Sequence, residues 1–277
     1  MSAPASAPAA TTSLWQGGEL VPRDDCDLAP AIVEVADSWL VEEGTVRGLE
    51  LHRERFLTSI PRSRARDLDL ESFWSASIAG IPRHGAWFPR VELREQLGMP
   101  QLLFRLREAP ALQRSLILTT HTGRDPRTQP TVKGPDLGAM VRLRTEAQRR
   151  GADEAVIVDD DGHIVEGSTT CLVWWDGGTL CVPDRTMPRI PSITERTVVA
   201  LATALSIPID EQRVRPEELD GREVWALNAL HGIRIVTAWQ GGPASTAEEP
   251  GRLSRWRLRL DALRRPLPEP DGGIGAA

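Results

Sequence analysis

The residue best suited to covalent chemistry in this sequence is Lys133, because it is the only lysine. The 277 residues carry 33 lysines and arginines together, and 32 of these are arginine. Arginine stays protonated at any biological pH, whereas burial or a nearby cation can lower a lysine pKa from about 10.4 toward neutrality. A lysine can therefore act as a nucleophile or a general base, which arginine cannot do. The alternative is that compositional drift toward arginine spared one exposed lysine.

Three further features could hold a charged, planar ligand beside that amine. Glu166 closes an apolar strand segment, where a buried carboxylate needs a partner, and the small residues 167–170 follow it. The segment 190–194 leads into a predicted helix, whose first N–H groups and dipole attract an anion. Arg55 lies on a predicted amphipathic helix and could face that anion. Each feature also has a plain structural reading, as a water-facing glutamate, an ordinary helix start and a surface arginine.

Composition argues against several other classes of protein. A net charge of -6 does not suit a nucleic-acid-binding domain. Three cysteines without paired spacing, Cys26, Cys171 and Cys181, argue against a disulfide framework and structural zinc. We expect Asp159–Asp161 to form a turn and expect no metal site. With no signal-peptide pattern and no long apolar stretch, the protein should be soluble, cytoplasmic and free of membrane contacts.

Apolar periodicity and turn residues predict an α/β (α+β) protein of two domains. The expected parts are a disordered tail over 1–13, a smaller domain over 14–121, a linker over 122–132, a larger domain over 133–265 and a second disordered tail over 266–277. Helices are expected near 49–60, 89–98, 136–150, 193–205 and 253–263. Strands are expected at 31–41, 114–120, 155–159, 163–168, 172–176, 179–183, 223–230 and 234–239.

An amine, a carboxylate, an arginine and a helix N-terminus are together what a pyridoxal 5'-phosphate site requires. The chain also resembles the class IV aminotransferases, the fold-type IV pyridoxal phosphate enzymes that include branched-chain and D-amino acid aminotransferases and aminodeoxychorismate lyase. Five segments carry the resemblance: LELHRERF (49–56), VKGPDL (132–137), GADEAVIVDDDGHIVEGSTTCLVW (151–174), IPSITERTVVALA (190–202) and EVWALNALHGIRIV (223–236).

The resemblance implies a role for particular residues. Lys133 would be the Schiff-base lysine and proton shuttle, and Glu166 the partner of the protonated pyridine nitrogen. The remaining cofactor-binding residues would hold or flank the phosphate: Arg55, Ile193, Thr194, Asn228 and Ala229. The resemblance further implies a cofactor in the cleft between the two domains and a homodimer. The chain departs from the family pattern at Cys171, Ser192 and Asp136, and in having no tyrosine.

The reaction is less closely determined than the cofactor. We expect an aminotransferase that moves an amino group between a small amino acid or amine and a 2-oxo acid. The alternatives are a 4-amino-4-deoxychorismate lyase, which releases pyruvate, and a non-catalytic cofactor-binding relative. Residues 228–230 resemble the lyase, whereas Glu34 resembles a transaminase glutamate. Weaker candidates for contacting the substrate are Arg234, His121 and His231.

Overall fold

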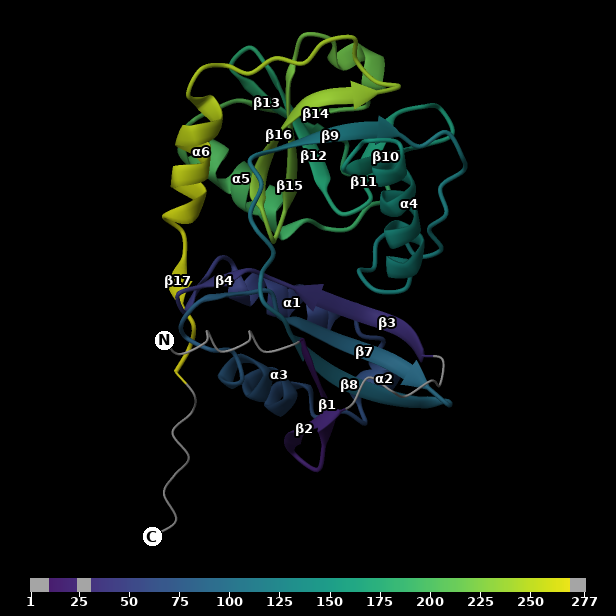
Figure 1. Ribbon diagram of the computed structural model, residues 1–277, viewed down its shortest axis with the longest axis vertical. Coiled ribbons are helices and arrows are strands. Elements are labelled where there is room, and N and C mark those ends of the chain that lie inside the picture. Colours follow the sequence, from purple (N-terminus) through teal and green to yellow (C-terminus); the bar gives the residue numbers. More distant parts are fainter. Residues whose placement is uncertain (1–9, 24–30, 270–277) are drawn as a thin grey trace, which may run out of the picture. The chain divides into compact units, whose positions relative to one another are not determined.

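The computed structural model describes residues 10–23 and 31–269 and divides the chain into two compact units (Figure 1). The first unit runs to Ala111 and takes up the chain again from Arg264, and the second comprises Leu112–Leu263. The expected boundary after residue 121 differs from this division, because the strand Ser115–Thr120 pairs with strands of the second unit. The segment expected to link the domains therefore lies inside the second unit.

The first unit is built on an antiparallel five-stranded sheet in the order β2-β1-β8-β7-β3. Its strands are β1 (Thr11–Gln16), β2 (Glu19–Arg23), β3 (Ala31–Ser38), β7 (Arg90–Gln96) and β8 (Met99–Leu106). A small second sheet joins β17 (Arg265–Pro266), β5 (Thr45–Val46), β4 (Val41–Glu42) and β6 (Ala86–Trp87). The helices are α1 (Leu49–Ser59), α2 (Arg62–Ala65) and α3 (Leu70–Ala79).

Aromatic side chains from α1 and α3 form the core of this unit. Phe56 of α1 lies 6.3 Å from Phe73 and 6.2 Å from Trp74, measured between ring centroids. Trp39 reaches Trp74 at 5.0 Å. The buried positions of α1 follow helical spacing, and this places Arg55 one residue before a fully buried phenylalanine.

Two expectations for the first unit were wrong. Residues 90–96 form the inner strand β7 and not a helix. Glu, Arg, Gln and Leu favour helices locally, but here buried Glu92 pairs with Arg90 of the same strand and with Arg105 of the neighbouring strand β8. The expected tails are also shorter: β1 begins at Thr11, and Leu267 is buried and bonded to Gly44. The rest of both tails, and Cys26, lie outside the described residues.

The second unit is a mixed sheet of eight strands in the order β11-β10-β9-β16-β15-β12-β13-β14. These are β9 (Ser115–Thr120), β10 (Glu154–Val158), β11 (Ile164–Gly167), β12 (Cys171–Asp176), β13 (Thr179–Pro183), β14 (Ile209–Gln212), β15 (Glu223–Asn228) and β16 (Gly232–Gln240). Its helices are α4 (Leu137–Arg149), α5 (Ile193–Ala204), α6 (Arg252–Asp261) and the 3-10 turn η1 (Pro216–Leu219). The expected helices and strands of this part of the chain are confirmed to within a few residues.

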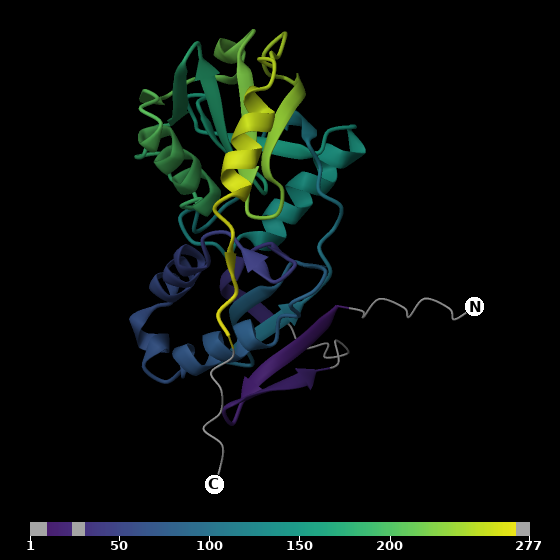
Figure 2. The ribbon, with the colours of Figure 1, turned by 90° about the vertical axis from the view of Figure 1, so that its left-hand side faces the viewer.

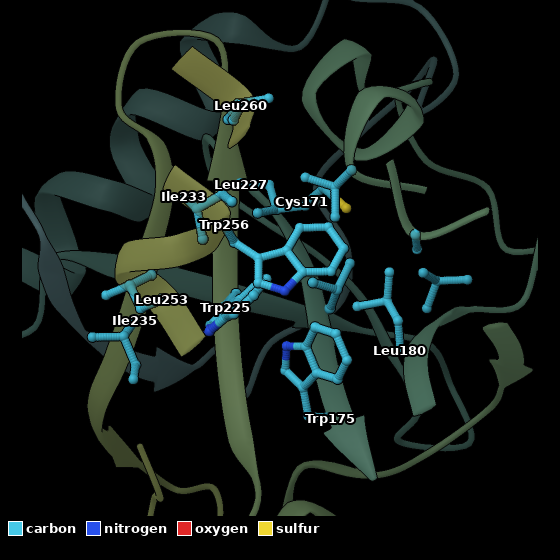
Figure 3. Close-up of a cluster of buried hydrophobic side chains, with 14 residues drawn as sticks. Cys171, Trp175, Leu180, Trp225, Leu227, Ile233, Ile235, Leu253, Trp256 and Leu260 are labelled. Carbon is cyan, nitrogen blue, oxygen red and sulfur yellow. The ribbon is translucent and has the colours of Figure 1, made fainter. Parts of the chain in front are cut away.

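One buried cluster of the second unit gathers side chains from seven of its strands, β9 to β13, β15 and β16. The sheet therefore curls around this cluster. On the other face, α5 packs on β15 and α6 on β16 (Figure 2). Beneath these two helices Trp175, Trp225 and Trp256 meet edge to face at 5.3–5.6 Å (Figure 3). Trp174 points to the opposite face, so both members of the Trp174-Trp175 pair are core residues and neither lies at a surface.

The longest helix in the described part of the chain, α4, has 13 residues. None of the described helices is long and apolar enough to cross a bilayer.

Truncating the central tryptophan of this cluster should destabilise the second unit strongly. Trp256 is 2% exposed, so Trp256→Ala should lower the free energy of unfolding by about 3–5 kcal/mol. Leu258→Ala is the matched control, because Leu258 lies on the same helix and is 71% exposed. Urea titrations of the three proteins measure the effect, and equal losses for both variants would contradict this account of the core.

Candidate active site

Lys133 lies in the loop between β9 and α4, three residues before the buried Asp136. The Asp136 carboxylate accepts hydrogen bonds from the amide and hydroxyl of Thr128 and from the amide of Gln129, each at 2.8 Å. These bonds fold the loop back on itself, and Gly134, at φ 156°, follows the lysine. The half-buried Lys133 is therefore held on a fastened loop rather than on a free linker.

Glu166 of β11 is a buried carboxylate on which the charge of Lys133 acts. It is 5% exposed, forms an ion pair with Arg127 and accepts a hydrogen bond from the Ile190 amide. Burial raises the pKa of Glu166 to about 7, although Arg127, the Ile190 amide, Arg189 and Lys133 all oppose that rise. One carboxylate thus connects the lysine loop, the end of β11 and the segment that enters α5.

The loop after Glu166 is fixed by a second buried acid, Glu154 of β10. Glu154 accepts hydrogen bonds from the Ser168 hydroxyl at 2.8 Å and from the amide and hydroxyl of Thr169, the amide at 2.9 Å. On the other side, the Asn228 side chain donates to the Thr169 carbonyl at 3.4 Å. The turn containing Asn228 and Ala229 is thereby brought beside the loop after Glu166.

Gly167 allows this loop to close tightly. A Cβ on Gly167 would lie 2.3 Å from the Thr170 hydroxyl, which no side chain tolerates. That hydroxyl is buried and has no hydrogen-bond partner in the part of the chain that the structure describes. A buried hydroxyl without a partner is costly, so this small-residue loop offers a donor to a ligand.

The N-terminus of α5 offers two backbone amides to an anion. Ser192 caps the helix, since its hydroxyl accepts from the Glu195 amide at 3.2 Å and its carbonyl from the Arg196 amide at 3.0 Å. Within the described ranges, no hydrogen bond uses the amides of Ile193 and Thr194, and both residues are buried. Such amides at a helix start, together with the dipole, suit a phosphate. Ser192, one of the positions where the chain departs from the family pattern, therefore serves as a helix cap.

Cys171 belongs to a charged cluster beside this helix. Its thiol donates to Glu195 at 2.7 Å, and Glu195 is also paired with Arg189 at 2.7 Å. Burial and the negative charge of Glu195 raise the pKa of the Cys171 thiol well above its ordinary value. Cys171 is thus a protonated hydrogen-bond donor, not a nucleophile.

Arg55 lies in the first unit and is oriented by a buried aspartate. Its Nε and one terminal nitrogen each donate to a different oxygen of Asp37 at 2.8 Å, and His52 contacts the same carboxylate at 2.8 Å. Burial alone would raise the pKa of Asp37, but His52 and Arg55 hold it well below its ordinary value. His52 and Arg55 of the segment LELHRERF therefore share one carboxylate, that of Asp37, which lies fifteen residues before the histidine.

The three weaker substrate candidates each contact other residues of the second unit. His121 contacts the Arg124 carbonyl through its ring nitrogen at 3.3 Å. His231 accepts a hydrogen bond from the Gln113 amide, and burial with the positive charge of Arg234 lowers its pKa to about 4. Arg234 is 1% exposed and pairs with Glu154 at 3.3 Å. His231 and Arg234 thus have structural partners inside the second unit, and their substrate roles stay predictions.

The turn at Asp159–Asp161 follows from its own hydrogen bonds. The Asp159 carboxylate accepts from the amides of Asp161 at 3.0 Å and His163 at 2.7 Å. These three side chains bring possible ligand atoms within 4.8 Å of one another, but the Asp159 oxygen already holds the turn.

Arg127 and Arg189, which act on Glu166 in the structure, were not predicted from the sequence as residues of the site. The one local signal was the pattern Asp125-Pro126-Arg127, which predicts a tight turn with the aspartate accepting from the arginine amide. The contact from Arg127 to Glu166 spans 39 residues of sequence, and no local pattern indicates it.

Comparisons with known proteins identify the family. The family model for class IV aminotransferases matches residues 34–239. The branched-chain-amino-acid aminotransferase of Escherichia coli strain K12 is 32% identical over 122 residues, and the match covers 40% of each chain. Among solved structures, the branched-chain aminotransferase of Thermoproteus uzoniensis with norvaline has a TM-score of 0.76 at 19% identity, covering 93% of this chain and 100% of that one. A protein described as a 4-amino-4-deoxychorismate lyase from Legionella pneumophila has a TM-score of 0.68 at 16% identity, covering 85% and 91%.

Because the family model covers most of the chain, this protein belongs to the class IV aminotransferases, and its fold is that of the fold-type IV pyridoxal phosphate enzymes. The family's cofactor is pyridoxal 5'-phosphate. The residues on the second unit fit that group: an amine, a buried carboxylate beside it, and two open helix amides. The curated relatives match along only 40% of their own length, so their substrates are not transferred to this chain.

The raised pKa of Glu166 should make the stability of the cofactor-free protein depend on pH. Between pH 4.5 and about 7 the folded state keeps a proton that the unfolded state has lost, so stability falls as pH rises through this window. The shift corresponds to roughly 3 kcal/mol. Glu166→Gln should flatten this part of the profile, measured as the free energy of unfolding by urea titration at several pH values. Glu146→Gln, at an exposed position of α4, is the control and should leave the slope unchanged. An unchanged slope in Glu166→Gln would contradict the assignment.

Proposed function

We propose that this protein is a pyridoxal phosphate-dependent aminotransferase that moves an amino group between a small amino acid or amine and a 2-oxo acid. The observation that carries the proposal is the position of the single lysine. Lys133 lies close enough to the buried Glu166 for its charge to lower the pKa of that carboxyl, and Glu166 is bonded to the segment that enters α5. Amine, acid and anion-binding amides therefore belong to one folded unit.

Each residue has a distinct task in this proposal. When bound, the cofactor supplies an electron-withdrawing ring that stabilises negative charge on the substrate α-carbon. Lys133 would hold the cofactor through its Nζ and, when free, that amine would accept the proton from the substrate α-carbon and give it back. Glu166 would hold the proton on the ring nitrogen of the cofactor. The proton transfers suit a lysine, because its amine can exist in both protonation states.

The phosphate group would be bound by backbone and side chain together. The amides of Ile193 and Thr194 point from the start of α5, and Asn228 and Ala229 form the neighbouring turn. Arg55 is proposed as a further phosphate ligand because Asp37 orients its guanidinium. The substrate roles of Arg234, His121 and His231, the cleft between the units, the homodimer and the cytoplasmic location stay predictions from the sequence.

A second function, 4-amino-4-deoxychorismate lyase activity, has one specific observation in its favour. Residues Asn228-Ala229-Leu230 resemble the lyase form of that turn, and the Asn228 side chain is bonded to the loop after Glu166. Against it, Glu34 resembles a transaminase residue. In the structure Glu34 pairs with Arg64 at 2.9 Å, so it is already engaged in the first unit.

Replacing the only lysine tests the proposal directly. Lys133→Ala should abolish the visible absorption band that pyridoxal phosphate acquires on linkage to a lysine, and should lower the amino-transfer rate by about 10²-fold to 10⁴-fold or more. Lys133→Arg is the informative partner, because it keeps a positive charge near Glu166 but cannot form the linkage. Both variants should fail equally in spectrum and rate, and recovery in Lys133→Arg would contradict the role assigned to the amine.

The two candidate reactions differ in what happens to the amino group. The holoenzyme should be mixed separately with a panel of amino acids and amines and with 4-amino-4-deoxychorismate. Conversion of the bound cofactor to its amine form, followed through the absorption spectrum, is the result expected for an aminotransferase. Release of pyruvate from 4-amino-4-deoxychorismate without an amino acceptor would instead assign the lyase reaction.

A further inference from the structure

Arg127 is the cation in direct contact with the Glu166 carboxylate. Its guanidinium forms a buried ion pair with Glu166, in which the arginine side chain is 1% exposed and the glutamate side chain 7% exposed. At this degree of burial, removing one partner leaves an uncompensated charge, so the pair acts as a unit. Neither residue is on the surface, where ion pairs contribute little.

Asp125 determines how Arg127 faces Glu166. The Asp125 carboxylate accepts from the Arg127 Nε at 2.9 Å, from a terminal nitrogen at 2.6 Å and from the backbone amide at 3.0 Å. The other terminal nitrogen is the one that contacts Glu166. Because the guanidinium is a rigid fork, fixing two of its nitrogens sets the direction of the third.

Three cations act on Glu166, and they differ in how permanent their charge is. Lys133 must lose its charge during the proposed reaction, since it binds the aldehyde and exchanges protons. Arg189 is shared with Glu195, to which it is bonded at 2.7 Å. Arg127 stays protonated at any biological pH, and its contact with Asp125 raises its pKa further. Of these three cations in the described part of the chain, Arg127 combines a permanent charge with an ion pair to the carboxylate.

We propose that Arg127, oriented by Asp125, is a positioning residue that keeps Glu166 ionised and aimed at the cofactor ring nitrogen throughout the reaction. The inference rests on the proposed function, because it is Glu166 that would hold the ring proton. If Glu166 took up a proton itself, it would no longer favour the charged ring, and the ring would withdraw electrons less strongly. Arg127 is thus assigned to the chemistry through Glu166 and not through contact with the substrate.

The described groups that act on Glu166 come from three segments. Arg127 and Lys133 belong to the loop before α4, Arg189 and the Ile190 amide to the segment before α5, and the Cys171 thiol to β12. The thiol is uncharged near neutral pH because burial raises its pKa well above the ordinary value. Of these groups, Arg127 therefore has the largest expected effect on the proton affinity of Glu166.

The decisive experiment uses the cofactor-free protein and a double-mutant cycle. The free energy of unfolding is measured by urea titration across pH for the unmodified chain, Arg127→Met, Glu166→Gln and the double variant. The difference between chains with and without Glu166→Gln isolates the titration of Glu166. An opposite charge in contact typically lowers a carboxyl pKa by about one to three units, so Arg127→Met should move this midpoint upward by one unit or more, a tenfold or greater gain in proton affinity.

Two variants control for a general loss of structure. Arg124→Met removes an exposed arginine from the same loop and should leave the midpoint unchanged. Arg127→Lys keeps a positive charge and should hold the midpoint near that of the unmodified chain. If Arg127→Met does not fold, Asp125→Asn releases the guanidinium without removing it and should give a smaller upward shift. An unmoved midpoint in the folded Arg127→Met or Asp125→Asn protein, or additive effects in the cycle, overturns the proposal.

A second readout uses the holoenzyme. The pH profile of kcat should shift upward in Arg127→Met by the same amount as the midpoint in the cofactor-free protein, because Glu166 becomes ionised again at higher pH. A merely structural role would lower kcat at every pH without displacing the profile. The two failures are distinguishable. A shifted midpoint in a protein that takes up no pyridoxal phosphate overturns the proposed function but not the coupling of Arg127 to Glu166. An unchanged midpoint in Arg127→Met overturns that coupling alone.

Discussion

The proposed site depends on keeping one carboxylate buried and charged beside an amine that, in the proposed reaction, must be able to lose its own charge. Burial makes ionisation of Glu166 unfavourable, which is why the pKa of this group is raised to about 7 even with cations close by. A site of this kind needs its compensating charge from groups that do not take part in proton transfer. The surrounding loops are arranged to supply that charge.

The curled sheet of the second unit brings those loops together. The lysine loop follows β9, and Glu166 lies near the end of β11. The Ile193 and Thr194 amides lie at the start of α5, and the Asn228 turn joins β15 to β16. These segments are distant in sequence. Three of them are held by a buried acid or a helix cap: the lysine loop by Asp136, the loop after Glu166 by Glu154, and the start of α5 by Ser192. The polar groups inside the unit therefore determine loop conformation as well as charge.

The sequence predicts the elements that carry their own local pattern. The helices α1, α4 and α5 and the two hairpins of the second unit are confirmed, because apolar spacing, caps and turn residues are local signals. Strand β7 was missed because its charged side chains have good helix propensity, and the contact of Glu92 with Arg105 of β8 exists only once the two strands pair. The end of the first unit was misplaced for the same reason, since the membership of β9 depends on the strands it pairs with.

The candidate site divides in a similar way. Lys133, Glu166 and the start of α5 were predicted from composition, a helix-start signal and the order of family segments. Arg127 and Arg189 were not, because an ion pair between distant loops exists only after the sheet has curled. Residues that bind a ligand through backbone amides are hard to predict from a sequence. Residues that shift the pKa of a neighbouring side chain are harder still.

A chain whose single lysine lies at the proposed reactive position also has an unusual practical property. Lys133 is half-buried on a fastened loop beside Glu166. Protein grown on isotopically labelled lysine would carry a single labelled side chain, so its resonance needs no assignment. The same position would be the only side-chain target for amine-directed labels. The composition that removed every other lysine has thus left the molecule with a built-in reporter at the centre of its proposed chemistry.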